Sequence, residues 1–309
     1  MKISCIMANY NTPRDYLVKA IDSIVCQTHR ELELIVVDDC STDNSCAVIE
    51  EFVQRDNRII LIKNDSNMGL ARSLNVALEK ASSDYIARMD TDDVSDPERF
   101  EIQLKFLLDN DLDIVGSETR RIDECGEVVV TRTNKSYSTR YISKVLRYEN
   151  CIAHPSWLVK RNVYKELSGY RYFRACEDYD FLLRAVKRGY RIGICDSVLL
   201  SYRINTKGIS QSNLLPQKVS SWYLASNLKR IEEIDQNEIN TKVLAKLTPK
   251  ANENFSLALM EYNRAIEMRR RGSIKTISYL FRACRKSRYM FKVFSCAFHV
   301  WICRLRYGR

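Results

Sequence analysis

The sequence predicts an α/β fold: a mostly parallel mixed sheet flanked by helices, followed by a helical C-terminal extension. The first 115 residues alternate apolar runs of strand length with segments of helical periodicity, which is typical of parallel sheets. Only 9 glycines and 5 prolines occur, too few for a turn-rich all-β protein. Beyond about Asn213 only helical patterns remain, so we expect one domain over residues 1–212 and a helical region over residues 213–309.

Five apolar runs define the strands of the first half, and helical patterns separate them. The expected strands are Ile3–Ala8, Leu32–Val37, Ile59–Ile62, Tyr85–Met89 and Asp113–Val115. Helices are expected to begin at Pro13, with Thr12 as N-cap, to cover about Ser45–Gln54 and Gly69–Ala81, and to begin again at Pro97.

The polar clusters of this region follow three of the strands. They are Asn9–Asn11, Asp38-Asp39 and Asp90–Asp93. Ligands bind open parallel sheets beyond the carboxyl ends of the strands. The sequence therefore predicts a ligand site at this edge of the sheet.

The remaining elements are less regular. We expect a hairpin over Thr119–Thr133 around Gly126, a helix after Glu177-Asp178, and two short strands at Arg191–Cys195 and Val198–Arg203. The C-terminal helices are expected to break near Pro249 and at Gly272.

Composition excludes several classes of protein. Apolar residues make up 45% and charged residues 28% of the 309 positions, which argues against disorder. The 11 cysteines show no zinc-ligand spacing, and Cys5, Cys195 and Cys284 lie in apolar stretches. With the odd count and the absence of a signal-peptide pattern, this predicts reduced thiols in a cytoplasmic setting. No apolar run reaches 18 residues, so no membrane span is expected.

The net charge of +10 belongs to the C-terminal tail. From Arg269 onward there are twelve Lys and Arg and no Asp or Glu, which leaves −2 for residues 1–268. From Tyr279 the cations are interleaved with large apolar residues, a pattern typical of a helix on an anionic membrane. The alternative is a helix that packs its apolar side on the main domain and leaves a solvated basic face. No nucleic-acid partner is expected, because no base-reading module is present.

The densest group of candidate ligands is Asp90-Thr91-Asp92-Asp93. Adjacent carboxylates repel one another unless a cation or solvent relieves them, and divalent cations bind carboxylate and phosphate oxygens together. Taken alone, this motif also fits a solvated acidic turn before Pro97, and Asp38-Asp39 also fits a turn or cap. Their shared edge favours a nucleotide site, with Arg72 available to meet a phosphate.

Motifs over roughly residues 1–210 resemble the family 2 glycosyltransferases. In chain order they are residues 4–11, 23–28, 33–43, 67–75, 87–93, 154–156 and 177–180. Each is weak alone, but their order and combination are specific. The resemblance implies a GT-A fold, inversion at the anomeric carbon and a nucleotide-sugar donor that is usually UDP-linked. Thr91 stands where the family usually has a small residue.

The resemblance also implies roles for single residues. Ala8 and Tyr10 would line the pocket of the base and Asp39 would contact the base. Asp90 would meet the ribose or the water shell of a Mn²⁺ or Mg²⁺ ion, Asp92 would ligate that ion, and Asp178 would be the general base.

Three further residues each have two possible roles. His154 would lie near the donor phosphates or the acceptor, or would simply satisfy a backbone carbonyl. Arg203 and Lys207 would close over the diphosphate, or would be solvated at the surface.

Physical chemistry is consistent with these roles. A bound cation stabilises the charge that builds on a departing diphosphate. Asp178 can take the proton of the attacking hydroxyl, with Glu177 and Asp180 raising its proton affinity. A nucleotidyltransferase, the alternative enzyme, needs a Gly-rich basic loop after the first strand, which Asn9–Pro13 lacks. A catalytically inactive membrane-recruited scaffold would not need Asp90, Asp92 and Asp178.

We therefore expect an inverting, metal-dependent hexosyltransferase of bacterial O-antigen or capsular polysaccharide assembly. It would move Glc or Gal from a UDP-sugar to a lipid-linked acceptor such as GlcNAc-diphospho-undecaprenol, with a β-linkage that is often β-1,3 in the family. Its expected place is the cytoplasm, peripheral on the inner face of the inner membrane. The donor sugar rests on the family's habits and not on a residue.

Overall fold

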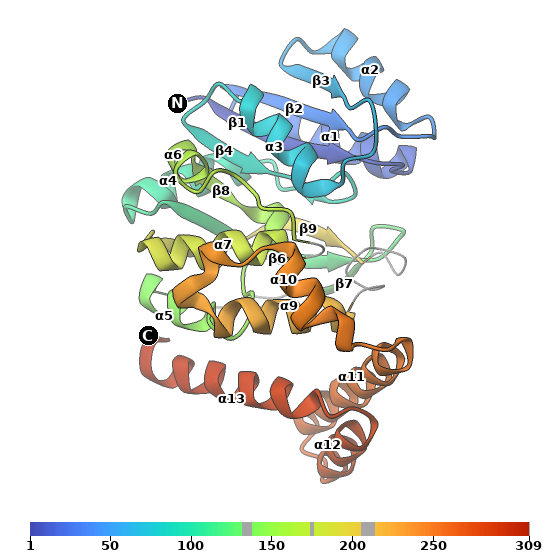
Figure 1. Ribbon diagram of the computed structural model, residues 1–309. Helices are drawn as coiled ribbons and strands as arrows, with labels where there is room; N and C mark the ends of the chain where they lie inside the picture. The colour runs from blue at the N-terminus through green and yellow to red at the C-terminus, as the bar shows by residue number, and fades with distance from the viewer. Residues whose placement is uncertain (132–137, 174–175, 205–213, 309) are drawn as a thin grey trace.

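Four parallel strands form the N-terminal half of a mixed sheet (Figure 1). β1 (Ile3–Asn9) pairs with β2 (Leu32–Asp38) on one side and β4 (Tyr85–Arg88) on the other, and β3 (Ile59–Lys63) extends the sheet beyond β2. These strands lie where the sequence predicts them. The computed structural model describes residues 1–131, 138–173, 176–204 and 214–308.

Beyond β4 the sheet contains antiparallel pairs. β8 (Leu158–Lys160) runs antiparallel between β4 and β6 (Ile114–Ile122), and β9 (Ile192–Arg203) runs parallel to β6 and antiparallel to β5 (Val94–Ser95). The two strands predicted over 191–203 are therefore one strand. Its pairing with β6 shifts by two residues at Asp196 and Ser197, because a bulge accommodates the polar pair that the sequence pattern presented as a break.

The predicted hairpin also forms within the described residues. β7 (Val128–Thr131) pairs antiparallel with β6, and Gly126 takes the positive φ of 95° in the turn between them. The end of the predicted range, residues 132 and 133, lies outside the described residues.

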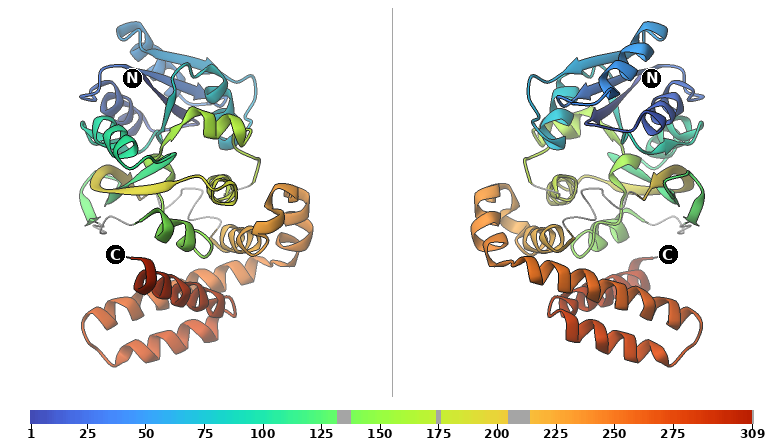
Figure 2. Two further views of the ribbon diagram at one scale, coloured as in Figure 1. Left: turned by 90° about the vertical axis from the view of Figure 1, so that its left-hand side faces the viewer. Right: turned by 90° about the vertical axis from the view of Figure 1, so that its right-hand side faces the viewer.

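Helices cover both faces of the sheet (Figure 2). Successive side chains of β1 point to opposite faces of the sheet. Cys5 and Met7 pack with one set of helices, and Ile6 packs with the other. The first set is α1 (Arg14–Val25), α2 (Ser45–Arg55) and α4 (Arg99–Asp109). The second is α3 (Leu70–Lys80), α5 (Thr139–Val145), α6 (Arg161–Glu166) and α7 (Glu177–Arg188).

Thr12 does not cap α1 as predicted. Pro13 occupies the N-cap position, and no side chain there accepts a helix N–H. The Thr12 hydroxyl instead hydrogen-bonds the Thr91 hydroxyl at 2.7 Å. The threonine thus joins the loop after β1 to the loop after β4, which local sequence could not reveal because 79 residues separate the two.

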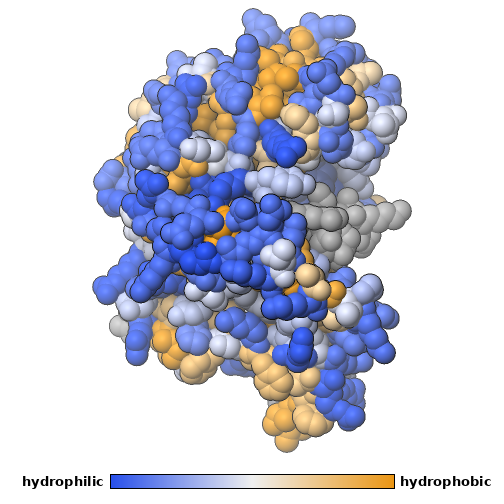
Figure 3. Space-filling view, viewed as in Figure 1, coloured by the Kyte–Doolittle hydropathy of each residue, from blue (hydrophilic) through white to orange (hydrophobic). Residues whose placement is uncertain are grey.

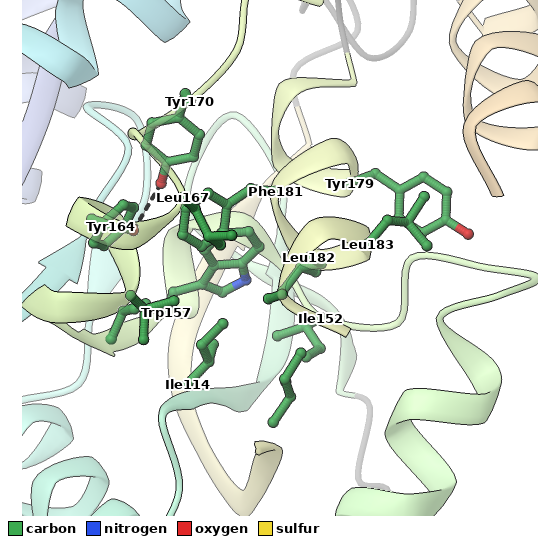
Figure 4. Close-up of a cluster of buried hydrophobic side chains, with 14 of the residues drawn as sticks. Ile114, Ile152, Trp157, Tyr164, Leu167, Tyr170, Tyr179, Phe181, Leu182 and Leu183 are labelled. Atoms are coloured by element: carbon green, nitrogen blue, oxygen red, sulfur yellow. Dashed lines mark hydrogen bonds between the residues drawn. The ribbon is translucent and has the colours of Figure 1, made fainter. Parts of the chain in front are cut away.

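An aromatic cluster fills the core beneath α7 (Figure 4). Trp157 is fully buried and packs against Phe181, which also contacts the rings of Tyr164 and Tyr170 in a tilted arrangement. The Tyr164 and Tyr170 hydroxyls hydrogen-bond at 2.9 Å. Aromatic rings bury large apolar areas, so this cluster fixes the base of α7, whose first turn carries Asp178.

The first of the C-terminal helices pack against this core, and the later ones form a second, smaller core. Side chains of α9 (Leu214–Ser226), η2 (Leu228–Glu233) and α10 (Gln236–Lys242) join the main core. The second core contains Leu215, Phe255, Ala283 and Met290. It joins α9 to α11 (Pro249–Arg270), α12 (Lys275–Lys286) and α13 (Met290–Tyr307), which lie at the end of the molecule opposite β3 (Figure 2). The domain boundary at residue 212 stays a prediction.

All eleven cysteines are free thiols; of the three in apolar stretches, Cys5 and Cys195 are buried and Cys284 is only half-buried. Burial raises the pKa of Cys5 to about 12, so this thiol is inert at neutral pH. Over the described residues, no helix combines the length and the apolarity that crossing a bilayer requires.

Candidate active site

A cavity of about 1340 Å³ opens beyond the carboxyl ends of β1, β2 and β4. Asp39, Asp92 and Asp178 all line it, although they come from three distant parts of the chain. Ala8, Tyr10, Asp90 and His154 line the same cavity. The structure therefore brings these seven residues to one place, and Arg72 lies outside the lining.

The loops after β1 and β2 are tied together beneath this cavity. Asn9 Nδ2 donates to Asp38 Oδ1 at 2.6 Å, and Asn11 Oδ1 accepts from the backbone N–H of Thr42 at 2.8 Å. Asn11 has a φ of 52°, a left-handed conformation that asparagine tolerates better than most residues. Asp38 is thus occupied in holding the loops, and Asp39 is the carboxylate that reaches the cavity.

Asp39 binds the loop that precedes α3. Its two oxygens accept the backbone N–H groups of Met68 and Gly69, both at 2.8 Å, and Oδ1 also accepts from Asn64 Nδ2. Gly69 has a φ of 83°, which permits two successive N–H groups to face one carboxylate. Burial raises the pKa of Asp39, but these hydrogen bonds outweigh it and leave the pKa below its ordinary value. Asp39 is therefore a fixed anion.

Asp90, Asp92 and Asp93 present carboxylate oxygens within 4.8 Å of one another. Burial, and then the charge of Asp90, raises the pKa of Asp92 to about 6. Asp93 is buried, and Oδ1 accepts the Arg203 N–H at 2.8 Å. Its Oδ2 has no hydrogen-bond partner among the described residues. Asp90 and Asp92 line the cavity and Asp93 does not.

This group fits a divalent cation. Mg²⁺ and Mn²⁺ favour carboxylate oxygens and keep several positions for water or phosphate. A cation would relieve the repulsion that raises the pKa of Asp92. Asp92 and Asp90 are the members of the group that line the cavity, and their role as metal ligands stays a prediction.

Arg88, which the sequence analysis did not single out, is the cation at the centre of the site. Its side chain is 2% exposed, lines the cavity and forms an ion pair with Asp90 at 2.5 Å. Its Nε and Nη1 have no hydrogen-bond partner among the described residues. The available signal was an arginine within an apolar strand, Tyr85–Met89, because a buried charge requires a partner.

Asp178 lies in the first turn of α7, where the helix N-terminus favours a negative charge. Asn150 Nδ2 donates to Asp178 Oδ2 at 2.8 Å, and the Tyr179 N–H donates to Oδ1 at 2.7 Å. Burial raises the pKa of Asp178, and the hydrogen bonds and Arg88 counteract only part of this rise. The predicted direction is therefore right. The main cause is burial and not the like charges of Glu177 and Asp180.

Asp180 has a structural role. It is fully buried between Arg184, 2.9 Å away, and Arg171, and these arginines also donate to carbonyls of residues 167, 169, 231 and 234. Asp178 does affect the protonation of Glu177. Burial, and then the charge of Asp178, raises the pKa of Glu177 to about 8.

His154 is buried at the cavity wall, and Nε2 lies 2.8 Å from the Tyr170 hydroxyl. The hydrogen-bond partner is thus a side chain and not the backbone carbonyl considered from the sequence. Burial, and then Arg88, lowers the pKa of His154 well below its ordinary value, so the ring is neutral at physiological pH.

Three residues expected at the phosphates, Arg72, Arg203 and Lys207, have different outcomes. Arg72 is outside the cavity lining, and its guanidinium lies 4.9 Å from the ring centre of Tyr172, which does line it. Its phosphate contact stays a prediction. Arg203 is 3% exposed, so surface solvation is wrong for this residue. Arg203 lines the cavity, and its Nε donates to the Asp92 carbonyl at 2.8 Å. Lys207 lies outside the described residues.

Comparison with known proteins agrees with this arrangement. Residues 4–168 match the family model described as Glycosyl transferase family 2. The chain is 35% identical over 234 residues to the O-antigen biosynthesis glycosyltransferase WbnJ of Escherichia coli. The aligned region covers 74% of this chain and 89% of WbnJ. The chain is also 35% identical over 223 residues to the uncharacterized glycosyltransferase MJ1057 of Methanocaldococcus jannaschii, in an alignment that covers 72% of this chain and 77% of that protein.

Solved structures share the fold. S. aureus TarS with UDP-GlcNAc aligns over 84% of this chain and 81% of its own, with a TM-score of 0.64 and 18% identity. The mannosyltransferase PcManGT of Pyrobaculum calidifontis, with GDP-Man and Mn²⁺, aligns over 93% and 87%, with a TM-score of 0.58 and 18% identity. The fold is accordingly GT-A-like, and the chain belongs to glycosyltransferase family 2.

Proposed function

We propose that this glycosyltransferase moves a hexose, Glc or Gal, from a UDP-sugar to a lipid-linked acceptor such as GlcNAc-diphospho-undecaprenol, with inversion of the anomeric carbon. The observation that carries the proposal is that Asp39, Asp92 and Asp178 line one cavity. An anion for the base, a metal ligand and a proton acceptor are the three groups that such a transfer needs. The product is a β-linkage, and β-1,3 is the first connectivity to test.

Each of these cavity residues has its own role in the proposed transfer. Asp39, fixed by Met68 and Gly69, offers its carboxylate to the base, beside Ala8 and Tyr10. Asp92 and Asp90 would hold a Mn²⁺ or Mg²⁺ ion, which would supply positive charge to stabilise the departing diphosphate. Asp178 takes the proton of the acceptor hydroxyl as that oxygen attacks the anomeric carbon from the face opposite the leaving group. This single displacement needs no covalent nucleophile.

One similar protein supports a place in bacterial surface-polysaccharide assembly, and two solved structures support a nucleotide-sugar donor and a divalent metal. WbnJ is an O-antigen biosynthesis glycosyltransferase, TarS was solved with UDP-GlcNAc, and PcManGT was solved with GDP-Man and Mn²⁺. By analogy, a nucleotide-sugar donor, a divalent metal and an O-antigen or capsular product are proposed for this chain.

We also propose that the protein is peripheral on the cytoplasmic face of the inner membrane, where a lipid-linked acceptor lies. Large apolar side chains of α12 and α13 are exposed, including Ile277, Phe281 and Phe291. Figure 3 shows apolar surface gathered at the end of the molecule that α12 occupies. Twelve Lys and Arg without a single Asp or Glu accompany it from Arg269 onward, which suits an anionic leaflet.

A donor screen tests the function. Purified protein with Mn²⁺ is incubated with UDP-Glc, UDP-Gal, UDP-GlcNAc or UDP-GalNAc and a synthetic GlcNAc-diphospho-lipid, and product is identified by mass spectrometry and NMR. We expect transfer from UDP-Glc or UDP-Gal that stops with EDTA. Activity only with nucleoside triphosphates would indicate a nucleotidyltransferase, and no binding of any UDP-sugar would indicate an inactive scaffold.

A further inference from the structure

One wall of the catalytic cavity is built by the last helix of the chain. Ala297, Val300, Trp301 and Arg304 of α13 line the cavity that also holds Asp178. Their spacing of three, one and three residues places them on one face of a helix. The cavity therefore continues past the residues assigned to the donor, as far as the basic tail.

This wall is held in a fixed position against α5. The Ser138 hydroxyl donates to the Tyr307 carbonyl at 3.1 Å, and the Arg140 guanidinium lies 4.8 Å from the centre of the Tyr307 ring. Further along α13, the His299 ring stacks on Tyr148 with centres 4.7 Å apart. These contacts fix both the end and the middle of the helix.

The segment that touches α13 leads directly to the proposed base. Tyr148 belongs to the loop after α5, and two residues later Asn150 donates to Asp178. Tyr141 and Val145 of α5 and Asn150 line the cavity as well. An acceptor whose hydroxyl lies at Asp178 therefore occupies a cavity that α5 and α13 also line.

The chemistry of α13 changes along this wall from cavity to outer surface. Trp301 is 52% exposed and lines the cavity, and Phe298 and Leu305, which precede and follow it by about one turn or less, are also exposed. The cavity-lining face and the exposed apolar face thus meet at Trp301. Arg304 lies beside it and forms no ion pair within the part of the chain that the structure describes.

We propose that Trp301 and Arg304 form an acceptor subsite for a lipid-borne sugar diphosphate. The Trp301 indole packs on the acceptor sugar, and the Arg304 guanidinium pairs with the diphosphate. The lipid chain extends out of the cavity along Phe298 and Leu305. Arginine matches phosphate geometry with two parallel N–H donors, and such charged hydrogen bonds are stronger than neutral ones. The inference rests on the proposed function because it assigns the second substrate of the same cavity.

The test measures binding of geranyl diphosphate, a soluble lipid diphosphate, by calorimetry. UDP and Mn²⁺ are present at saturation so that the diphosphate does not enter the donor site. We expect Arg304→Ala to weaken binding by about tenfold, as the loss of a charge-assisted pair implies. The matched control is Arg306→Ala, because Arg306 is also exposed in the last turn of α13 but does not line the cavity.

Tryptophan emission gives an independent readout. Geranyl diphosphate carries no sugar, but Trp301 lies about one helical turn from Arg304. Binding of the diphosphate at Arg304 is therefore expected to change the emission of the adjacent indole, and Trp301→Phe, which retains Trp157 and Trp222, is expected to remove the change. Equal affinities of the wild type, Arg304→Ala and Arg306→Ala would overturn the inference, as would equal weakening in both variants or no binding to the wild type.

A separate titration with UDP and Mn²⁺ distinguishes the two levels of proposal. Failure of UDP to bind the wild type defeats the proposed function. Normal UDP binding, together with an affinity for geranyl diphosphate that is unchanged in Arg304→Ala, defeats only the acceptor subsite.

Discussion

At the scale of single residues, Asp178 is the proposed general base. Its carboxylate lines the cavity and accepts hydrogen bonds from Asn150 and the Tyr179 N–H. Asp178→Asn keeps the shape but cannot take a proton. We expect transfer to fall by about 10²–10⁴-fold, with the affinity for UDP and Mn²⁺ unchanged in calorimetry. Asp196→Asn, at an exposed position of β9, is the control. Near-normal turnover of Asp178→Asn would assign the proton transfer to another group.

Burial and the charge of Asp90 raise the pKa of Asp92 to about 6, which predicts a defined pH dependence for the proposed metal site. Below that pH Asp92 is protonated and cannot bind a cation, so metal and proton compete. We expect Mn²⁺ to raise the Tm strongly at pH 7.5 and much less at pH 5, as measured by differential scanning fluorimetry. Asp92→Ala is expected to lose the increase at both values. A pH-independent increase would show that Asp92 is not a ligand.

At the scale of elements, α7 is held in place by a buried ionic group. Asp180 is fully buried between Arg171 and Arg184, and the two arginines connect α7 to the loop before it and to η2. Removing one partner of a buried pair leaves an uncompensated charge. We expect Asp180→Asn to lower the free energy of unfolding by about 3–5 kcal/mol, as measured by urea denaturation.

The control for this element is Glu232→Gln. Glu232 pairs with Lys187 and Arg188 on the partly exposed outer side of α7, where solvent screens ion pairs. We expect a clearly smaller change in stability than for Asp180→Asn. Equal losses in the two variants would mean that the buried network does not hold α7.

At the scale of the whole molecule, the end formed by α12 and α13 is expected to bind membranes. Ile277, Phe281 and Phe291 are 69%, 63% and 66% exposed, so replacing them removes no core packing. The triple variant with Glu at these positions is expected to lose at least about tenfold in partitioning to anionic vesicles, since each buried apolar side chain contributes roughly 1.5–3 kcal/mol. Flotation measures this.

Leu108→Glu is the control for the vesicle experiment, because Leu108 is a comparable exposed apolar residue that lies on α4. Unchanged UDP binding of the triple variant would show that the site remains intact. Vesicle binding that persists in the triple variant would contradict a role for α12 and α13 at the membrane.

The sequence alone determined the strands and the edge where the site lies. Period and length placed β1 to β4, because each is a continuous apolar run bounded by polar residues. Their parallel arrangement then brought Asp39 and Asp92 to one edge, because parallel strands end on the same side. These inferences succeeded because the signal is local or follows directly from strand direction.

Only the tertiary structure decided what depends on contacts between distant segments. The sequence identified Thr12 as a helix cap, but its hydroxyl binds Thr91. It placed Asp180 among groups that tune Asp178, but two arginines neutralise Asp180. Neither Arg88 as the buried charge that pairs with Asp90 nor α13 as a wall of the cavity was evident. Pairing and burial are properties of neighbours in space, and a linear pattern does not specify which distant side chains become those neighbours.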